Sequence, residues 1–148
     1  MSLIVDNLIV ASFEESFDED LLASHKVTHV LNVASECEVC NEGRQNLIYA
    51  KHAIGDDDAD ASMIDILSAC MSFLDGANVT IVHCLEGKSR SVCVVLAYMC
   101  LRLGWQWDDA LAHVRGVRPC ISPFPKYLRE TRAFVEVSLY GFKTKVLA

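Results

Sequence analysis

Nine consecutive residues, His83 to Ser91, carry the side-chain types that can bind and attack a phosphate. They read His-Cys-Leu-Glu-Gly-Lys-Ser-Arg-Ser, between the short apolar run Val79–Val82 and a longer one that begins at Val92. A loop between a buried strand and a buried helix is an anion site, because unpaired amides and the helix dipole point at it. The amides expected to surround the anion belong to Leu85, Glu86, Gly87, Lys88, Ser89 and Arg90.

Cys84 stands at the start of this loop, where the same amides stabilise a thiolate. Thiol pKa values in such places fall from about 8.5 to roughly 3.5–7.5, so a nucleophile exists at neutral pH. Arg90 offers a planar guanidinium that holds two phosphate oxygens and stabilises the charge of an in-line displacement. We expect Ser91 to donate a hydrogen bond to the sulfur and His83 to orient the loop. Gly87 permits backbone angles that a Cβ would forbid.

The competing interpretation is that Cys84 is an ordinary core cysteine, which is the commoner role of a lone buried thiol. Here, however, histidine, cysteine, glycine and arginine stand at fixed offsets between the right two elements. Four specified positions match by chance in a chain this short on the order of once in a thousand. The spacing therefore favours a nucleophile.

The loop resembles the His-Cys-x5-Arg-Ser/Thr signature of the cysteine-based protein tyrosine phosphatases, and the chain is most similar to their small dual-specificity group. Further similar segments are Thr28–Ala34 (THVLNVA), Leu96–Met99, Ala110–Arg115 and Arg118–Pro123. The resemblance implies hydrolysis of phosphotyrosine and phosphoserine or phosphothreonine in phosphoprotein substrates through a phosphocysteine. It implies one catalytic domain, residues 1–148, that uses no metal and no other cofactor.

Such a reaction needs a general acid, because the departing alkoxide or phenoxide must be protonated. The segment Asp56–Asp60 holds four aspartates, and the resemblance places the acid in this loop. Aligning the following helix with the family favours Asp57, with Asp58 and then Asp56 as alternatives. Acidic residues in loops are usually only solvated, which is the interpretation for the remaining three.

The rim of the site departs from the family pattern. Phe124-Pro125-Lys126-Tyr127 follows Ser122–Pro123, where the family has Asn-x-Gly-Phe, and we expect Tyr127 to replace the aromatic residue. Arg118 and Lys88 are candidate rim cations that bind the substrate. The alternative for both is that they only face solvent.

Strand and helix patterns alternate along the chain. A hairpin is expected at Leu3–Ala11, and strands at Val27–Val33, Leu47–Ile54 and Val79–Val82. Helices are expected at Asp18–Ser24, Ser62–Gly76, Ser91–Leu103 and Asp108–Arg115, and from Pro125 onward. Ser62 with Asp65 resembles a capping box, and Gly76 and Gly116 resemble C-terminal caps. This pattern indicates a single α/β domain, and the resemblance implies a central, mostly parallel sheet of about five strands flanked by helices.

The bulk composition excludes several classes. With 13 basic and 20 acidic residues the formal net charge is −7, so no nucleic-acid partner is expected and an anion site must be built locally. The apolar run Val92–Leu101 is too short to span a bilayer, and we expect no signal peptide, because no basic segment followed by an apolar stretch stands at the N-terminus. We expect a cytoplasmic or nuclear protein that has no membrane partner.

The seven cysteines form an odd set without a secretory signal, which indicates a reducing compartment. Cys37 and Cys40 have C-x-x-C spacing. We interpret them as structural thiols, with a redox role as the alternative, because no second pair of metal ligands accompanies them.

Three other functions stay open. The same scaffold acts in some cases on phosphoinositide, RNA or nucleotide phosphates, but such loops usually add basic residues, and only Lys88 accompanies Arg90 here. A phosphate-binding adaptor would keep the loop without a well-placed acid. A sulfur transferase has a similar cysteine loop but needs neither Ser91 nor an acidic loop.

Overall fold

The computed structural model describes residues 1–38 and 46–147. Its described strands form one sheet in the order β1-β2-β5-β3-β4. Their bounds are β1 Ser2–Val5, β2 Leu8–Ala11, β3 His29–Ala34, β4 Ile48–Ile54 and β5 Thr80–His83. The β1–β2 hairpin is antiparallel, and the pairings β2–β5, β5–β3 and β3–β4 are parallel. The expected mostly parallel sheet is confirmed.

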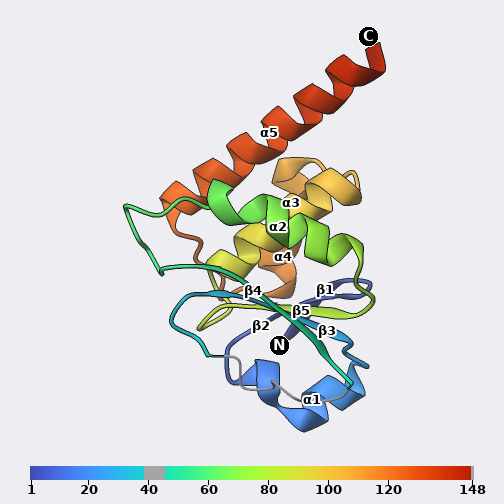
Figure 1. The fold of residues 1–148 in the computed structure, drawn as a ribbon, viewed down its shortest axis with the longest axis vertical. Helices are drawn as coiled ribbons and strands as arrows, with labels where there is room; N and C mark the ends of the chain where they lie inside the picture. The colour runs from blue at the N-terminus through green and yellow to red at the C-terminus, as the bar shows by residue number, and fades with distance from the viewer. Residues whose placement is uncertain (39–45, 148) are drawn as a thin grey trace.

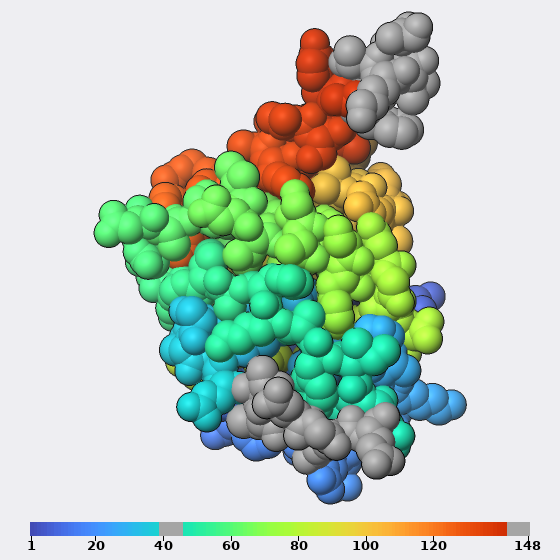
Figure 2. Space-filling model, in the orientation of Figure 1, coloured from blue at the N-terminus to red at the C-terminus, as the bar shows by residue number. Residues whose placement is uncertain are grey.

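The helices lie on both faces of this sheet (Figure 1). Their bounds are η1 Glu15–Phe17, α1 Glu19–Ser24, α2 Ile64–Asp75, α3 Arg90–Arg102, α4 Trp107–Val117 and α5 Pro125–Leu147. Figure 1 shows α1 on one face and α2 to α5 on the other, and the later turns of α5 extend away from the body. The coloured part of α5 lies above α2 in the space-filling view (Figure 2). No helix among the described residues has the length and apolar character needed to cross a bilayer.

The central strands are buried on both faces because alternate side chains enter two different cores. The core beneath α2, α3, α4 and α5 receives Val10, Leu31 and Val82. The smaller core beneath α1 receives Ile9, Val30 and Ile81, together with Leu22 of α1. This arrangement explains why β3 and β5 place apolar side chains on both faces and do not alternate apolar with exposed polar residues.

Helix α3 lies in the middle of the domain, as its apolar residues on every face predict. Most of its residues from Arg90 to Cys100 are buried, and it packs against α2, α4 and α5. The loop from Cys84 to Ser89 is therefore suspended between a buried strand and a buried helix. Its two ends cannot move without disturbing the core.

Two expected helix caps are wrong. The capping box at Ser62 does not form, because α2 begins at Ile64 after Met63 and the Ser62 hydroxyl instead donates to Glu130 on α5. Helix α4 runs through Gly116, and its C-cap is Arg118, whose amide donates to the carbonyl of Val114 at 2.8 Å. At Ser62 a tertiary contact outweighs the local signal, whereas α4 continues past Gly116 through its own helical hydrogen bond.

Candidate active site

The predicted anion loop joins β5 to α3, with its nucleophile and its arginine buried beside each other at the carboxyl edge of the sheet. Cys84 is 3% exposed and Arg90, the first residue of α3, is 1% exposed. The carboxyl ends of parallel strands are where open α/β sheets bind ligands. The fold thus brings together the residues from 84 to 91 that the sequence selected.

The carbonyl groups of the loop point away from the site because other segments bind them from behind. The amide of Phe13 donates to the carbonyl of Leu85 at 2.8 Å, and the amide of Ser122 donates to that of Lys88 at 2.9 Å. Because these carbonyls are hydrogen-bonded outside the pocket, the peptide N–H groups of the loop face inward, as an anion-binding nest requires.

Arg118 binds the two carbonyls between these. Its Nε donates to Gly87 O at 2.7 Å and its Nη2 to Glu86 O at 3.3 Å, while Nη1 donates to Ser2 Oγ at 3.0 Å. The expectation that Arg118 is a substrate-binding rim cation is therefore corrected. Its guanidinium is buried behind the loop, because loop carbonyls are the acceptors that it satisfies there.

Gly87 is required by the same close packing. Its φ is +68°, a left-handed conformation that glycine adopts readily. A Cβ at this position would lie 2.7 Å from Ala11 O and 2.7 Å from Arg118 Nη2. No side chain fits between the loop and the groups that hold it.

The sulfur of Cys84 is surrounded by hydrogen-bond donors. Burial alone would raise the pKa of Cys84, but hydrogen bonds from the Ser91 hydroxyl and from backbone groups of Ser91, Ser89 and Gly87 outweigh burial and hold this pKa below its ordinary value. The Ser91 Oγ lies 3.3 Å from Cys84 Sγ. The geometry is what the sequence led us to expect for Ser91.

His83 supports the loop from within. Its Nδ1 lies 3.0 Å from the main-chain oxygen of Cys84, and since a carbonyl only accepts, Nδ1 donates. Burial lowers the pKa of His83, which keeps the ring neutral. This contact fits the expected orienting role and leaves the ring outside the phosphate pocket.

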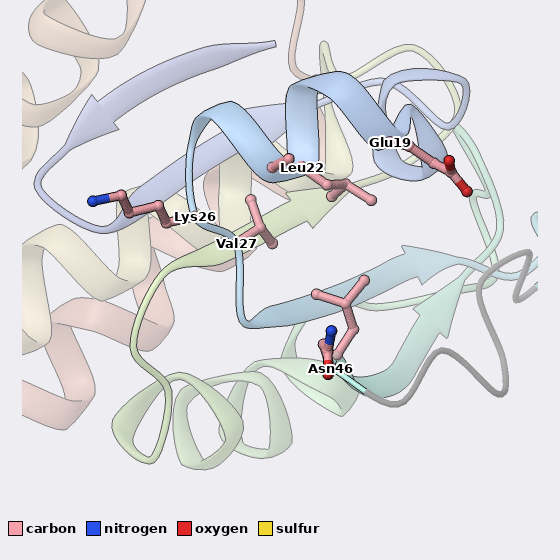
Figure 3. Close-up of a pocket in the computed structure, with 7 residues that line it drawn as sticks. Glu19, Leu22, Lys26, Val27 and Asn46 are labelled. Carbon is pink, nitrogen blue, oxygen red and sulfur yellow. The ribbon is translucent and has the colours of Figure 1, made fainter.

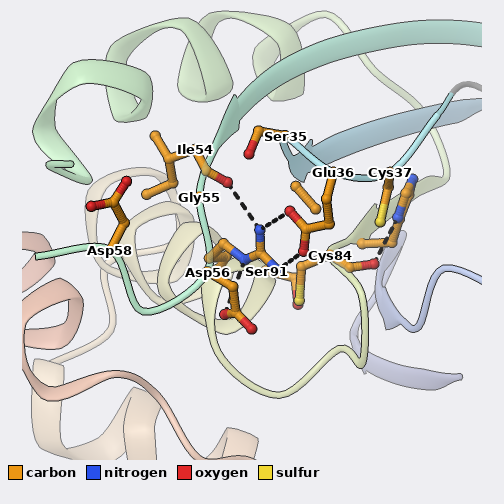
Figure 4. Close-up of polar contacts among 12 residues, drawn as sticks. Ser35, Glu36, Cys37, Ile54, Gly55, Asp56, Asp58, Cys84 and Ser91 are labelled. Carbon is orange, nitrogen blue, oxygen red and sulfur yellow. Dashed lines mark hydrogen bonds and ion pairs between the residues drawn. The ribbon is translucent and has the colours of Figure 1, made fainter. Parts of the chain in front are cut away.

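The guanidinium of Arg90 is held by a residue that the sequence analysis did not select. Nη1 donates to Glu36 Oε2 at 2.7 Å and Nη2 to Glu36 Oε1 at 2.5 Å, and Nη1 also donates to Ile54 O at 2.9 Å. Figure 4 shows Glu36, Ile54 and Asp56 converging on one point beside Cys84 and Ser91. The hydrogen bonds from Arg90 lower the pKa of Glu36, so it is an anion at neutral pH.

The remaining edge of Arg90 faces the pocket. Among the described residues its buried Nε has no hydrogen-bond partner, and its contact with Asp56 Oδ1, at 3.4 Å, is an ion pair only. A buried N–H without an acceptor costs free energy unless a ligand satisfies it. One edge of the guanidinium is thus held by hydrogen bonds to Glu36 and Ile54, while the Nε edge has only the ion pair with Asp56 and keeps an unused N–H.

The aspartate loop covers the site, and its members differ in position. Asp56 and Asp57 line the pocket, whereas the carboxylate of Asp58 accepts from the amide of Asp60 at 2.8 Å. Asp57 has a φ of +45°. Tyr127 anchors this loop: its buried hydroxyl donates to Gly55 O at 2.7 Å and accepts from the amide of Asp58 at 3.2 Å.

The pocket has a volume of about 180 Å³ and is lined by Asp56, Asp57, Cys84, Glu86, Lys88, Ser89, Arg90 and Ser122. Lys88, the other predicted rim cation, does lie there, with its Nζ 3.2 Å from Glu86 Oε2. A larger cavity of about 460 Å³ lies beside α1, over Leu22, Val27 and Leu47 (Figure 3). None of the predicted site residues lines it.

The other buried cysteines among the described residues are poor nucleophiles, because burial raises their pKa values. Burial raises the pKa of Cys70 to about 12 and, despite a hydrogen bond from Thr131, that of Cys93 to about 12. Burial also raises the pKa of Cys37, and its C-x-x-C partner Cys40 lies outside the described residues. The pKa of Cys84 is therefore lowered, whereas the pKa values of the other buried cysteines are raised.

Known proteins share both the sequence pattern and this arrangement. Residues 8–136 match the family model for the catalytic domain of dual specificity phosphatases. The chain is 28% identical over 148 residues to dual specificity protein phosphatase 22 of Xenopus tropicalis, covering 97% of this chain and 69% of the relative. It is 32% identical over 133 residues to dual specificity protein phosphatase 1 of Arabidopsis thaliana, covering 87% of this chain and 66% of the relative.

Solved structures show the same fold. DUSP15 superposes with a TM-score of 0.80 at 26% identity, covering 93% of this chain and 88% of that one. The human tyrosine phosphatase-like serine/threonine/tyrosine-interacting protein superposes with a TM-score of 0.82 at 23% identity, covering 94% and 97%. At the latter identity the likeness concerns the fold alone.

Proposed function

Because the chain belongs to the dual-specificity phosphatase family and is thereby a cysteine-based phosphatase, we propose that it hydrolyses phosphotyrosine, phosphoserine and phosphothreonine in proteins through a phosphocysteine on Cys84. The proposal assigns the phosphate clamp to Arg90 and the general acid to Asp57. It rests on the geometry of these side chains and on the local electrostatics.

The observation that carries the proposal is the buried Nε of Arg90. It has no hydrogen-bond partner among the described residues, and Arg90 lines the same pocket as Cys84. A phosphoryl group placed over the sulfur would satisfy this N–H together with the inward-facing loop amides. An ordinary core cysteine would not be accompanied by a fixed, half-satisfied guanidinium.

The first chemical step transfers the phosphoryl group to sulfur. The thiolate of Cys84 attacks phosphorus, the S–P bond forms, and the P–O bond to the substrate side chain breaks with its electron pair on oxygen. Asp57 gives its proton to that oxygen, so the alcohol or phenol departs neutral. Arg90 and the loop amides stabilise the charge on the three non-bridging oxygens during the displacement.

The second step returns the enzyme to its starting state. Asp57, now ionised, takes a proton from a water molecule that attacks phosphorus, and the S–P bond breaks to release phosphate. The departing sulfur is a thiolate, which Ser91 stabilises through the contact at 3.3 Å. With Cys84, Asp57, Arg90, Ser91 and the loop amides, every bond and proton transfer of the two steps is accounted for.

The dimensions of the pocket support dual specificity. A volume of about 180 Å³ is smaller than the 300–1,000 Å³ typical of small-molecule sites. Such a pocket encloses the phosphoryl group and its ester bond, and leaves most of the amino-acid side chain outside. Recognition of phosphate rather than of the phenol ring accommodates all three phosphorylated residues.

Cys84→Ser tests the proposal. The serine variant should lose turnover of p-nitrophenyl phosphate by at least about 10³-fold while still binding vanadate or phosphate, since Arg90 and the loop amides remain. Cys120→Ser, which changes an exposed cysteine, is the matched control and should keep wild-type activity. Appreciable turnover by Cys84→Ser would contradict the assignment of the nucleophile.

A further inference from the structure

The mouth of the pocket is acidic although its ligand is an anion. Three carboxyl groups line it, those of Asp56, Asp57 and Glu86. Asp57 carries the catalytic proton in the proposed reaction, so we call the other two, Asp56 and Glu86, the acidic rim. The side chain of Asp56 is 53% exposed and that of Glu86 is 66% exposed. Both therefore face whatever part of a substrate stays outside the pocket.

The two cations of the pocket are already neutralised by carboxylates. Arg90 is bound by both oxygens of Glu36 and lies 3.4 Å from Asp56. Lys88 is paired with Glu86 at 3.2 Å. Once a phosphoryl group occupies Arg90 and the loop amides, no positive charge of this pocket is left for a second anionic group.

Three further basic side chains, those of Arg118, Lys51 and Lys126, also donate hydrogen bonds to acceptors of the protein. Arg118 is buried behind the loop on its carbonyls. Lys51 Nζ donates to Cys37 O at 2.8 Å, and Lys126 Nζ donates to Ala59 O at 3.0 Å. Each of these acceptors is a main-chain carbonyl, so these side chains hold loops in place.

We propose that the acidic rim selects phosphorylated residues flanked by lysine or arginine, and disfavours polyanionic substrates such as phosphoinositides. This inference rests on the proposed phosphatase function and names its substrate class. Residues within two positions of the phosphorylated one lie about 3.3–7 Å along an extended chain. That is within the Debye length of about 8 Å at physiological salt, so their charges interact with the acidic rim.

The effect of each flanking charge is that of an exposed ion pair. Such pairs favour binding by about threefold per arginine, and a like charge disfavours it by a similar factor. Since the whole chain has a net charge of −7, its long-range field has the same sign as the acidic rim. The two contributions therefore reinforce each other.

The experiment compares three phosphotyrosine peptides that differ only at the two positions before and the two positions after the phosphotyrosine. These positions are all arginine in the first peptide, all alanine in the second and all aspartate in the third. We expect kcat/KM in the order arginine, alanine, aspartate, with about a tenfold or larger span between the extremes. Raising NaCl from about 0.05 to 0.5 M should compress this span, because salt screens exposed charges. Equal rates, or the reverse order, would overturn the inference.

A double variant assigns the preference to the acidic rim. Asp56→Asn with Glu86→Gln should reduce the arginine-to-aspartate ratio of kcat/KM severalfold, whatever happens to the absolute rates. Asp109→Asn removes one exposed charge near the end of α4 remote from Arg118, and it should leave the ratio unchanged. A ratio unaffected by the double variant would contradict the assignment.

Binding to Cys84→Ser separates this inference from the catalytic proposal. If wild-type protein hydrolyses none of the peptides but Cys84→Ser binds the arginine-flanked peptide most tightly, the proposed reaction is wrong and the selectivity stands. If Cys84→Ser binds all three peptides equally or none of them, the selectivity is wrong. Faster hydrolysis of phosphoinositide vesicles than of the arginine peptide would also overturn it, and would favour the non-protein substrate.

Discussion

Arg118 and Gly87 are joined by a hydrogen bond of 2.7 Å between the guanidinium Nε and the loop carbonyl. The two residues are 31 positions apart, and the bond passes behind the anion loop rather than into its pocket. Together with the bond from Arg118 Nη2 to Glu86 O and the contacts from the amides of Phe13 and Ser122, it binds four consecutive loop carbonyls from outside the pocket. We therefore expect Arg118 to be a positioning residue, one that affects the substrate only through the orientation of the loop amides.

We predict that Arg118→Ala lowers kcat/KM by about 10²-fold and the free energy of unfolding by about 2–4 kcal/mol, since two buried carbonyls lose their donor. Arg118→Lys should recover part of the stability but less of the activity, because one ammonium cannot bind both carbonyls in a fixed plane. Urea unfolding and steady-state kinetics measure the two effects.

A purely structural role for Arg118 would leave the reactivity of Cys84 unchanged in the folded variant. We instead expect the pH profile of iodoacetamide alkylation to move toward higher pH in Arg118→Lys, because misaligned amides stabilise the thiolate less. An unshifted profile would show that the loop amides keep their direction without Arg118.

Glu36 should set the orientation of Arg90. We predict that Glu36→Ala raises the Kd for phosphate and lowers kcat/KM by about 10–100-fold, because a guanidinium without its anchor no longer aims Nε at the pocket. The cost in unfolding free energy should be only about 1–2 kcal/mol, below that of a fully buried pair, since Glu36 is 38% exposed.

The conservative variant Glu36→Gln distinguishes orientation from charge. Its amide oxygen still accepts one hydrogen bond from Arg90, so it should retain more activity than Glu36→Ala. If instead Glu36→Ala binds phosphate more tightly than wild type, Glu36 competes with the substrate for Arg90 and does not position it.

Ser91 should control the acid limb of the pH–rate profile. Donors around Cys84 hold its pKa below the ordinary value, so the active thiolate is present above that pKa and is lost as the pH falls through it. Ser91→Ala removes one donor, and we expect the acid limb of kcat/KM to move to higher pH. Ser91→Thr, which keeps the hydroxyl, should show the wild-type limb.

The lowered pKa of Cys84 also makes the stability of the protein depend on pH. A group whose pKa is lower in the folded state stabilises the protein above its unfolded-state pKa, and this contribution disappears as the pH falls through the folded-state pKa. The difference in unfolding free energy between wild type and Ser91→Ala should therefore be larger when Cys84 is ionised than at acid pH. A difference independent of pH would mean that Ser91 acts by packing alone.

The sequence predicted those parts of the site that are local in the chain. The order of strands and helices and the loop from Cys84 to Ser91 follow from periodicity and from one strand–loop–helix motif. Glu36 was missed because a single glutamate in a polar loop has no pattern that connects it to an arginine 54 positions later. Arg118 was placed on the rim because its charge suggested solvent, whereas the tertiary fold supplied carbonyl acceptors that only coordinates reveal.

The last prediction concerns the aspartate loop, where the sequence left three candidates. Asp56 and Asp57 both line the pocket, but Asp56 is ion-paired with Arg90, and the carboxylate of Asp58 accepts from the amide of Asp60. We predict that Asp57→Asn lowers kcat for phenyl phosphate by about 10²-fold, because its departing oxygen needs a proton. Asp58→Asn should change kcat by less than about threefold.

Leaving-group dependence decides whether the loss in Asp57→Asn is chemical. p-Nitrophenolate departs with little need for protonation, so Asp57→Asn should impair p-nitrophenyl phosphate turnover much less than phenyl phosphate turnover. Tyr127→Phe, which loosens the loop at Gly55, should give a weaker loss with the same dependence. Equal losses for both substrates would show that Asp57 is not the proton donor, and Asp56→Asn would then be expected to show the leaving-group dependence instead.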